Sequence, residues 1–382
     1  MKWGSLCVLA LGVAALSTPL TAQDTTLPPC TERSTALLHP WVDTRLFCLE
    51  LVIFDESGGE LGFTALATAP NGVLYAARPY AGQIFEITDT DSDLLPDSAH
   101  IVADNLTLPN GLVYYDEALY ISGGANIYRL GDGKLEILVD DLPSGEGFWT
   151  GGLTVGPDER IYVATGAPCN LCVADDEQRG TILSFALDGS DKQLVTTGLR
   201  QPADLTFHMG VLWTVDSAPM STQANMDELN HVVPGEDFGW PYCEGRESRG
   251  DLNITYFDCS EVLTPAFNFP AQSQPLGIVS YSSDTFPKVK AALLVVLAGV
   301  REDVNMMGYR LVAVLFDEGG NPIATYDVVP NVDNFYLFTN AKQVNYHGFG
   351  FWPHRPIDVT VNAEGWIYLS VGGGQIFALR PV

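Results

Sequence analysis

The sequence predicts an all-β fold, a six-bladed β-propeller, from three observations. A unit of two alternating strands joined by a tight turn recurs six times along the chain. Further aromatic-rich strands follow these hairpins, as a blade of antiparallel strands requires. No long stretch has the apolar spacing typical of a helix, and the G-x-G-x-x-G motif is absent. Two packed β-sandwiches are the alternative, but the repeats favour a propeller that forms one domain.

The hairpins follow one another in chain order. Each has period-two apolar runs on both sides of a turn such as Pro-Asn-Gly, Pro-Asp-Glu or Asn-Ala-Glu-Gly, which is the signal of a hairpin. The expected hairpins cover 62–77, 111–123, 152–166, 203–216, 277–299 and 357–372. Outer strands are expected at 82–88, 126–130, 181–187 and 375–381.

Two long insertions are expected, at about 217–274 in the fourth unit and 301–350 in the fifth. Because propeller loops gather at the two ends of the central channel, such insertions can form the wall of a pocket.

The N-terminus predicts export. Residues 1–22 read as a signal peptide, with Lys2 before a short apolar run and small residues up to Ala22. We expect residues 23–55 to form an N-terminal extension tethered by a disulfide, and residues 56–382 to form the propeller. A secreted or periplasmic protein is therefore expected.

The cysteines agree with an oxidising compartment, because six remain after the signal peptide. Sequence alone allows fifteen pairings of six cysteines. Pairing between nearest neighbours predicts Cys30–Cys48, Cys169–Cys172 and Cys243–Cys259. For Cys169 and Cys172 a redox or zinc motif is the alternative, but no second CxxC motif or histidine cluster completes a zinc site.

Net charge excludes two classes of partner. The chain carries 47 acidic and 19 basic residues, a formal charge of −28. Such a surface repels phosphate backbones and anionic lipids, so we expect no nucleic acid and no membrane as partner. The oligomeric state is left open.

One acidic loop has the spacing of a weak calcium site. Asp89, Asp91, Asp93 and Asp97 give D-x-D-x-D-x-x-x-D, but Leu94 stands where an EF-hand loop has glycine. A solvated acidic loop between blades is the alternative.

Three segments resemble the soluble glucose/sorbosone dehydrogenase family. The first is the hairpin at 152–166 with its Cys-Asn-Leu-Cys tail. The second runs from Gly-Leu-Arg-Gln-Pro at 198–202 through Asp-Glu-Leu-Asn at 227–230 to Phe-Gly-Trp-Pro-Tyr-Cys at 238–243. The third joins Pro-Leu-Gly at 275–277, Gly-Tyr-Arg at 308–310 and Arg-Pro-Ile-Asp-Val at 355–359. The similarity covers roughly residues 60–382.

The resemblance implies a function: oxidation of a small sugar or aldehyde by hydride transfer to pyrroloquinoline quinone (PQQ), polarised by Ca²⁺, with a histidine as base. It assigns Arg200, Gln201, Arg355 and Trp149 to the cofactor, and main-chain carbonyls of Ala218 and Pro219 to Ca²⁺.

This chain departs from the family where the base is expected. The family's histidine position falls on Phe148, which cannot accept a proton, so the catalytic residue is unknown. His347 and His354 could reach the channel mouth from the last insertion. Arg200 has an alternative role, in which it ties one blade turn to its neighbour.

Two other functions stay open. One is a non-catalytic propeller that binds a carbohydrate or a protein partner. The other is a metal-dependent lactonase-like site, for which carboxylates such as Asp204, Asp216 and Asp358 would have to converge on the channel.

Overall fold

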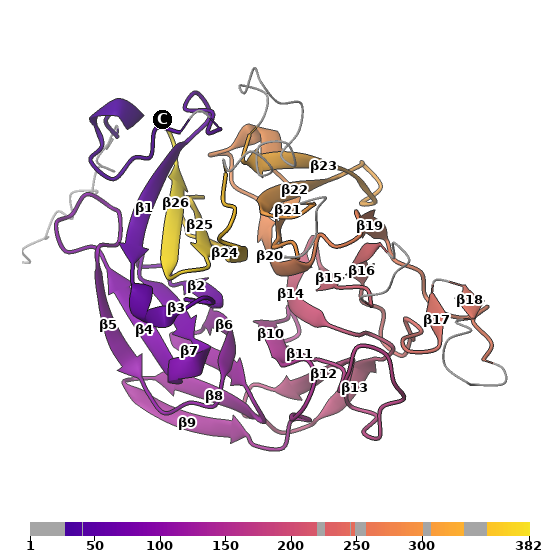
Figure 1. The fold of residues 1–382 in the computed structure, drawn as a ribbon. Coiled ribbons are helices and arrows are strands. Elements are labelled where there is room, and N and C mark those ends of the chain that lie inside the picture. The colour runs from indigo at the N-terminus through magenta and orange to yellow at the C-terminus, as the bar shows by residue number, and fades with distance from the viewer. Residues whose placement is uncertain are drawn as a thin grey trace, which may run out of the picture.

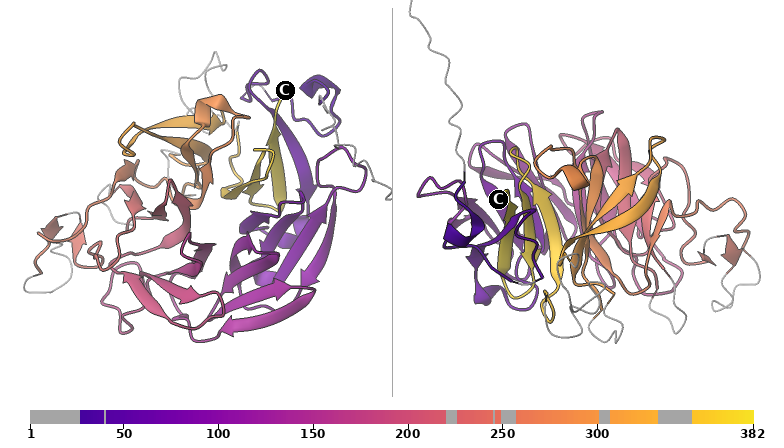
Figure 2. Two further views of the ribbon diagram at one scale, coloured as in Figure 1. Left: turned by 180° about the vertical axis from the view of Figure 1, so that it is seen from behind. Right: turned by 90° about the horizontal axis from the view of Figure 1, so that it is seen from above.

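The computed structural model describes residues 27–39, 41–219, 226–244, 246–248, 257–300, 307–331 and 350–382. It confirms the predicted fold. Six antiparallel sheets of four strands each stand around a central axis as the blades of a propeller (Figure 1). Seen from above, the blades form a thick disc (Figure 2). The expected signal peptide lies outside the described residues.

Each blade takes its strands in chain order from the axis outward, and the last blade alone departs from this rule. Blade 1 consists of β2 Ala65–Thr68, β3 Leu74–Arg78, β4 Gln83–Thr88 and β5 Ser98–Ala103. Blade 2 consists of β6 Pro109–Tyr115, β7 Ala118–Gly123, β8 Asn126–Gly131 and β9 Lys134–Val139. Blade 3 consists of β10 Thr150–Val155, β11 Arg160–Thr165, β12 Thr181–Ala186 and β13 Gln193–Thr196. Blade 4 consists of β14 Pro202–His208, β15 Val211–Asp216, β16 Asp227–His231 and β19 Phe267–Phe269. Blade 5 consists of β20 Pro275–Tyr281, β21 Ala292–Leu297, β22 Arg310–Phe316 and β23 Pro322–Val329. Blade 6 consists of β24 Pro356–Val361, β25 Ile367–Val371, β26 Gln375–Arg380 and β1 Cys48–Phe54.

All six predicted hairpins are the two inner strands of a blade, so the repeat was identified in the correct register. The small remaining elements of the described residues are the ribbon β17 Cys243–Glu244 with β18 Glu247–Ser248, and the single-turn 3₁₀ helices η1 Cys30–Glu32, η2 Glu56–Gly58, η3 Pro79–Ala81 and η4 Pro287–Val289.

The two expected insertions are shorter than predicted. The range 217–274 contains β16 and β19, which are the outer strands of blade 4, and 301–350 contains β22 and β23 of blade 5. The prediction was wrong here because these outer strands are short or lack the aromatic-rich pattern of the others. In blade 4, what separates the outer strands is the stretch 232–266, which holds β17 and β18.

The ring is closed by pairing the two ends of the chain. Strand β1 runs antiparallel to β26, so the N-terminal and C-terminal colours meet in blade 6 (Figure 1). The expected boundary at residue 56 is therefore corrected: β1 lies in the stretch predicted as an extension, yet it completes a blade. The cause is that the last blade has three strands of its own, and a propeller without a fourth leaves an edge unpaired.

A buried ion cluster holds this junction together. The Glu50 carboxylate is fully buried and accepts hydrogen bonds from Arg33 at 2.8 Å and from two nitrogens of Arg380 at 2.8 Å each. The Cys30–Cys48 disulfide anchors the preceding segment beside it.

The core lies between blades. Strand β21 is buried at every position, and its neighbours in blades 4 and 6 supply the facing apolar side chains. A strand covered on both faces needs apolar residues throughout, which explains the Ala-Leu-Leu-Val-Val-Leu run without alternation.

All three predicted disulfides are present: Cys30–Cys48, Cys169–Cys172 and Cys243–Cys259. The bonded Cys169 and Cys172 have no thiolate left for a metal, so the zinc alternative is not supported. Among the described residues, no helix has both the length and the apolar character needed to cross a membrane.

Candidate functional site at the channel mouth

The central channel opens at the end where the inner strands begin. The inner strands β2, β6, β10, β14, β20 and β24 contact one another around the axis, and five of them carry a register shift near their first residues. A cavity of about 420 Å³ occupies this region. We call its entrance the mouth, which is lined by Tyr80, Trp149, Gln201, Gln274 and Arg355.

Three of the four residues predicted to hold a cofactor meet in this cavity: Trp149, Gln201 and Arg355. The half-buried Trp149 ring meets the edge of Tyr80, with 5.7 Å between ring centroids. Tyr80 is 70% exposed, so the pair forms an aromatic surface open to solvent. Sequence reasoning missed Tyr80, which lies in a 3₁₀ turn rather than in a strand.

Arg355 donates a hydrogen bond to Oε1 of Gln274 across the start of two neighbouring blades. Among the described residues that line the cavity, Arg355 is the one cation. Gln274 was not predicted as a site residue. Its left-handed backbone (φ 48°) and its position just before β20 are the signals that it ends a turn at the mouth.

Arg200 lies behind the mouth and does not line the cavity that these residues share. Its side chain is buried, with the guanidinium 4.3 Å from the centroid of the Phe148 ring. Its nitrogens donate to the carbonyl of Ser217 at 2.8 Å and to the side-chain and main-chain oxygens of Asn170 at 2.6 and 3.2 Å. These contacts fit its alternative role, a tie between neighbouring turns.

Phe148 takes part in the cavity wall and packs on Arg200. A second buried arginine, Arg179, fixes this segment by donating to the carbonyls of Glu146 at 2.8 Å, Phe148 at 3.2 Å and Ala167 at 3.0 Å. Sequence reasoning missed Arg179. Arg179 thus fixes the segment where the resemblance predicts a base, and the side chain at that position is the apolar ring of Phe148.

Histidines are mostly remote from the mouth in the described part of the chain. His354 is the exception: with Glu60 it lines a second cavity of about 500 Å³, which shares Arg355 with the mouth. His208 is buried and bonded to Ser280 at 2.8 Å. His347 lies outside the described residues.

The turn expected to supply main-chain ligands for Ca²⁺ follows β15. The amide of Ala218 donates to Asp227 at 2.9 Å, and the amides of Arg200 and Gln201 donate to Asp216 at 2.9 and 2.6 Å. Burial raises the pKa of both carboxyl groups to about 6, against these hydrogen bonds. The carboxylates of Asp216 and Asp227 therefore hold the backbone of this turn in place through hydrogen bonds with its amides. Asp216 does not line the channel.

Asp204 and Asp358 do line the channel, one step below the mouth. Burial raises the pKa of Asp358 to about 7 and that of Asp204 well above its ordinary value, with a further contribution to Asp204 from the charge of Asp358. At the corresponding place in four other inner strands the chain has Ala65, Gly111, Gly152 and Gly277. Asp204 and Asp358 could have been identified from the sequence by this signal, an acidic residue at a repeat position that has a small residue in the other blades.

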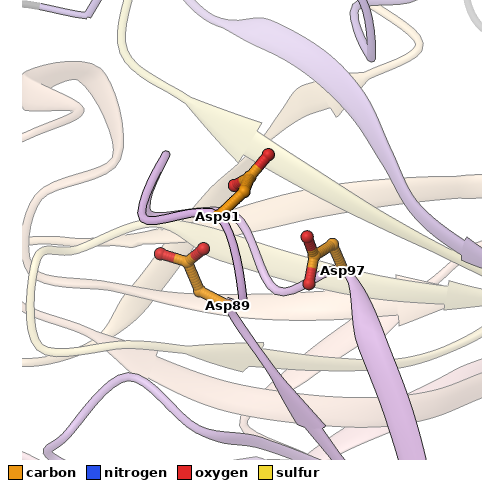
Figure 3. A group of neighbouring side chains, drawn as sticks. All are labelled: Asp89, Asp91 and Asp97. Carbon is orange, nitrogen blue, oxygen red and sulfur yellow. The ribbon is translucent and has the colours of Figure 1, made fainter.

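The acidic loop joins β4 to β5 at the rim. One carboxylate oxygen from each of Asp89, Asp91 and Asp97 lies within 4.8 Å of the others, and the three side chains surround one small space (Figure 3). Asp93 does not belong to this group; its carboxylate accepts from the amide of Leu95 at 2.7 Å. Three of the four predicted residues thus gather.

A model of a known protein family matches part of this chain. The family described as Glucose / Sorbosone dehydrogenase matches residues 133–310. The resemblance drawn from the motifs is therefore confirmed.

Solved structures share the fold at low sequence identity. The PQQ domain of pyranose dehydrogenase from Coprinopsis cinerea is 16% identical, with a TM-score of 0.69 over 87% of this chain and 95% of that one. A Trichoderma reesei enzyme of family AA12 is 16% identical, with a TM-score of 0.70 over 88% and 96%. The PQQ-bound aldose sugar dehydrogenase of Streptomyces coelicolor is 16% identical, with a TM-score of 0.58 over 88% and 98%. An uncharacterized protein of Borreliella burgdorferi is 24% identical over 71% of this chain and 75% of that protein.

Proposed function

We propose that this protein is an exported sugar-dehydrogenase-like oxidoreductase that takes a small sugar or aldehyde at the channel mouth. The observation that carries the proposal is the meeting of Trp149, Gln201 and Arg355, far apart in sequence, in one cavity of about 420 Å³. The family match and the quinone-binding relatives support it, and the three disulfides support export.

The residues of the mouth fit the ring system of a quinone better than its charges. Trp149 and Tyr80 offer aromatic surface, and Gln201 and Gln274 offer amide groups. For a cofactor with three carboxylates, the described lining offers one guanidinium, that of Arg355. When bound, PQQ would supply the hydride acceptor.

This chain's own residues would bind and orient the substrate. Amide side chains exchange hydrogen bonds with sugar hydroxyls, and an aromatic face packs against the apolar face of a sugar ring. Main-chain carbonyls of Ala218 and Pro219 would face the Ca²⁺, held in place by the buried carboxylate of Asp227. None of the residues that define the mouth is a carboxylate or a histidine, and the resemblance to the family predicts the base at the position of Phe148, which cannot accept a proton.

The test is a comparison of the purified protein with its Phe148→His variant, each supplied with PQQ, Ca²⁺ and a panel of aldoses. We expect the variant to oxidise sugars faster by roughly 10²–10⁴-fold, which is the contribution of a positioned base. Equal rates would contradict the proposal that the mouth is an oxidoreductase site.

A second function is favoured by the packing of Phe148 on Arg200: a non-catalytic propeller that binds a carbohydrate. Calorimetric titration with the same aldoses in the absence of PQQ separates the two. Saturable sugar binding combined with an inert Phe148→His variant would support the binding module.

A further inference from the structure

We propose that the Cys169–Cys172 disulfide is a redox-sensitive site, at which a dithiol reductant opens the bond and loosens the wall of the mouth cavity. The two cysteines have the C-x-x-C spacing in which redox-active disulfides occur, and the structure shows them bonded. The site does not require the sugar-dehydrogenase function, because its effects fall on the protein's own segments.

This disulfide is the accessible one among the three of the described chain. Cys169 and Cys172 are half-buried, and Val173 beside them is 53% exposed. The cysteines of the other two disulfides are buried, with at most 6% of each exposed. A reductant must bring its thiolate to one of the two sulfurs, so access decides which disulfide it attacks first.

The loop that Cys169–Cys172 closes is also the shortest. Its cysteines are three residues apart, whereas the other two disulfides span 18 and 16 residues. The stabilisation that a disulfide gives by restricting the unfolded chain grows with the length of the loop, so folding favours the bonded state least at this site. Exposed disulfides are the labile ones, and labile disulfides are typical of regulatory sites.

Opening the bond is a two-electron thiol–disulfide exchange. A thiolate of the reductant attacks one sulfur of the pair, the S–S bond breaks, and a mixed disulfide forms while the other cysteine leaves as a thiol. The second thiolate of the reductant then displaces the cysteine that is still bound. The reductant is oxidised to a disulfide, and Cys169 and Cys172 take up its two electrons and two protons.

Asn170, which stands between the two cysteines, connects this loop to the cavity wall. Its main-chain oxygen accepts from Arg200 at 3.2 Å and from Nε1 of Trp240 at 3.3 Å, and its side-chain oxygen accepts from Arg200 at 2.6 Å. The Arg200 guanidinium lies 4.3 Å from the centroid of the Phe148 ring, which lines the mouth cavity. Because the disulfide restricts the backbone of Asn170, its opening releases the acceptors that fix Arg200.

The loop also touches the Phe148 segment through the backbone. A Cβ on Gly147 would stand 2.3 Å from the carbonyl carbon of Pro168, the residue before Cys169. The amide of Phe148 donates to the carbonyl of Ala167 at 2.9 Å. Two stretches in such close contact move together, so a change at Cys169 reaches the cavity wall.

The first experiment tests whether this disulfide opens selectively. The folded protein is titrated with dithiothreitol, free thiols are blocked with iodoacetamide, and the labelled cysteines are mapped by mass spectrometry. We expect Cys169 and Cys172 to be reduced at a dithiol concentration about tenfold or more below that required for the other two disulfides. Reduction of all three disulfides at one concentration, or resistance of this pair until the protein unfolds, would overturn the proposal.

The second experiment tests the connection to the mouth by hydrogen exchange, at the dithiol concentration that opens this pair alone. We expect the amide of Phe148 to exchange about tenfold faster in the reduced protein, since its bond to Ala167 opens more readily. The fully buried strand β21 is the internal control, and its exchange should not change. Equal exchange at Phe148 in both states would contradict a link between the disulfide and the cavity wall.

A variant imitates the reduced state without a reductant. Cys169→Ser combined with Cys172→Ser should show fast exchange at Phe148 from the start, and dithiol should not raise it further. Asn170→Ala is the matched control, because it keeps the disulfide and should keep a rise in exchange on reduction. Slow exchange in the folded serine variant would overturn the proposal, and if that variant does not fold, the wild type with and without dithiol decides.

Discussion

Arg200 illustrates how a residue can match a family motif and yet serve the scaffold. Its charge lies beneath Phe148, and its donors are used by the carbonyl of Ser217 and the oxygens of Asn170. The Cys169–Cys172 disulfide closes the loop that carries Asn170. Arg200 is therefore a positioning residue for the two turns that border the mouth.

Removing the guanidinium of Arg200 should affect the stability of the fold more than it affects the binding of a ligand at the mouth. Arg200→Ala removes three hydrogen bonds that a buried guanidinium donates, so we expect the free energy of unfolding to fall by about 3 kcal/mol or more. Urea denaturation measures this. Lys290→Ala is the control: Lys290 pairs with Asp284 at the surface, both side chains being exposed, and its loss should cost less than about 1 kcal/mol. Equal effects would contradict the structural role of Arg200.

At the same scale, Gly152 is required by its neighbour rather than by its backbone. A Cβ on Gly152 would stand 1.8 Å from Oδ1 of Asp204. We expect Gly152→Ala to lower stability by about 1–3 kcal/mol in the wild type, and by clearly less in an Asp204→Ala background, where the clashing carboxylate is absent. A double-mutant cycle by chemical denaturation measures the difference, and strict additivity would refute the clash.

At the scale of elements, the closure of blade 6 depends on Glu50 between Arg33 and Arg380. The hydrogen bonds and charges of these arginines outweigh burial and hold the pKa of Glu50 below its ordinary value of 4.5. A carboxyl group with a lowered pKa in the folded state stabilises the protein above its unfolded pKa, and that contribution is lost as pH falls through the folded pKa.

Glu50→Gln should therefore destabilise the protein by about 3–5 kcal/mol at pH 7, because it leaves two buried arginines without their counter-charge. The difference in melting temperature between wild type and variant should shrink as the pH falls below 4.5. A difference that is independent of pH would show that packing, not charge, holds the junction.

The elements also show what the sequence could predict and why the rest could not. Each inner hairpin was predictable, because its alternating pattern and tight turn are local properties. Strand β1 was missed because its partner β26 is more than three hundred residues away, and nothing local marks that pairing. Trp149 and Arg355 were found through their motifs, whereas Tyr80, Arg179 and Gln274 have roles set by contacts between blades.

For the whole molecule, the buried carboxylates and the net charge of −28 both lower the stability of the folded state as the pH rises. Asp216 and Asp227 have pKa values raised to about 6, and Asp358 to about 7. A carboxyl group with a raised pKa binds more protons in the folded state than in the unfolded state. Stability therefore falls as the pH rises from the unfolded pKa of the group to its folded pKa. Desolvation lowers the pKa values of His39 and of the buried His208, which acts in the opposite direction, but only up to their ordinary value of 6.5.

In a chelator at low salt, the free energy of unfolding should therefore decrease between pH 6.5 and pH 8. Asp358→Asn should flatten this slope, because it removes the group that titrates near 7. Urea denaturation at half-unit steps of pH measures both. A wild-type stability that rises over this interval would contradict the assignment of Asp358 as an uncompensated buried acid.

The most direct test of the proposed function is a titration of the purified protein with PQQ and Ca²⁺, followed by absorbance and by melting temperature. We predict saturable binding at micromolar cofactor, a raised melting temperature, and weaker binding in Arg355→Ala, whose guanidinium lines the mouth. No binding well above micromolar PQQ would contradict it and would leave a propeller that has kept the fold of the sugar dehydrogenases without their cofactor.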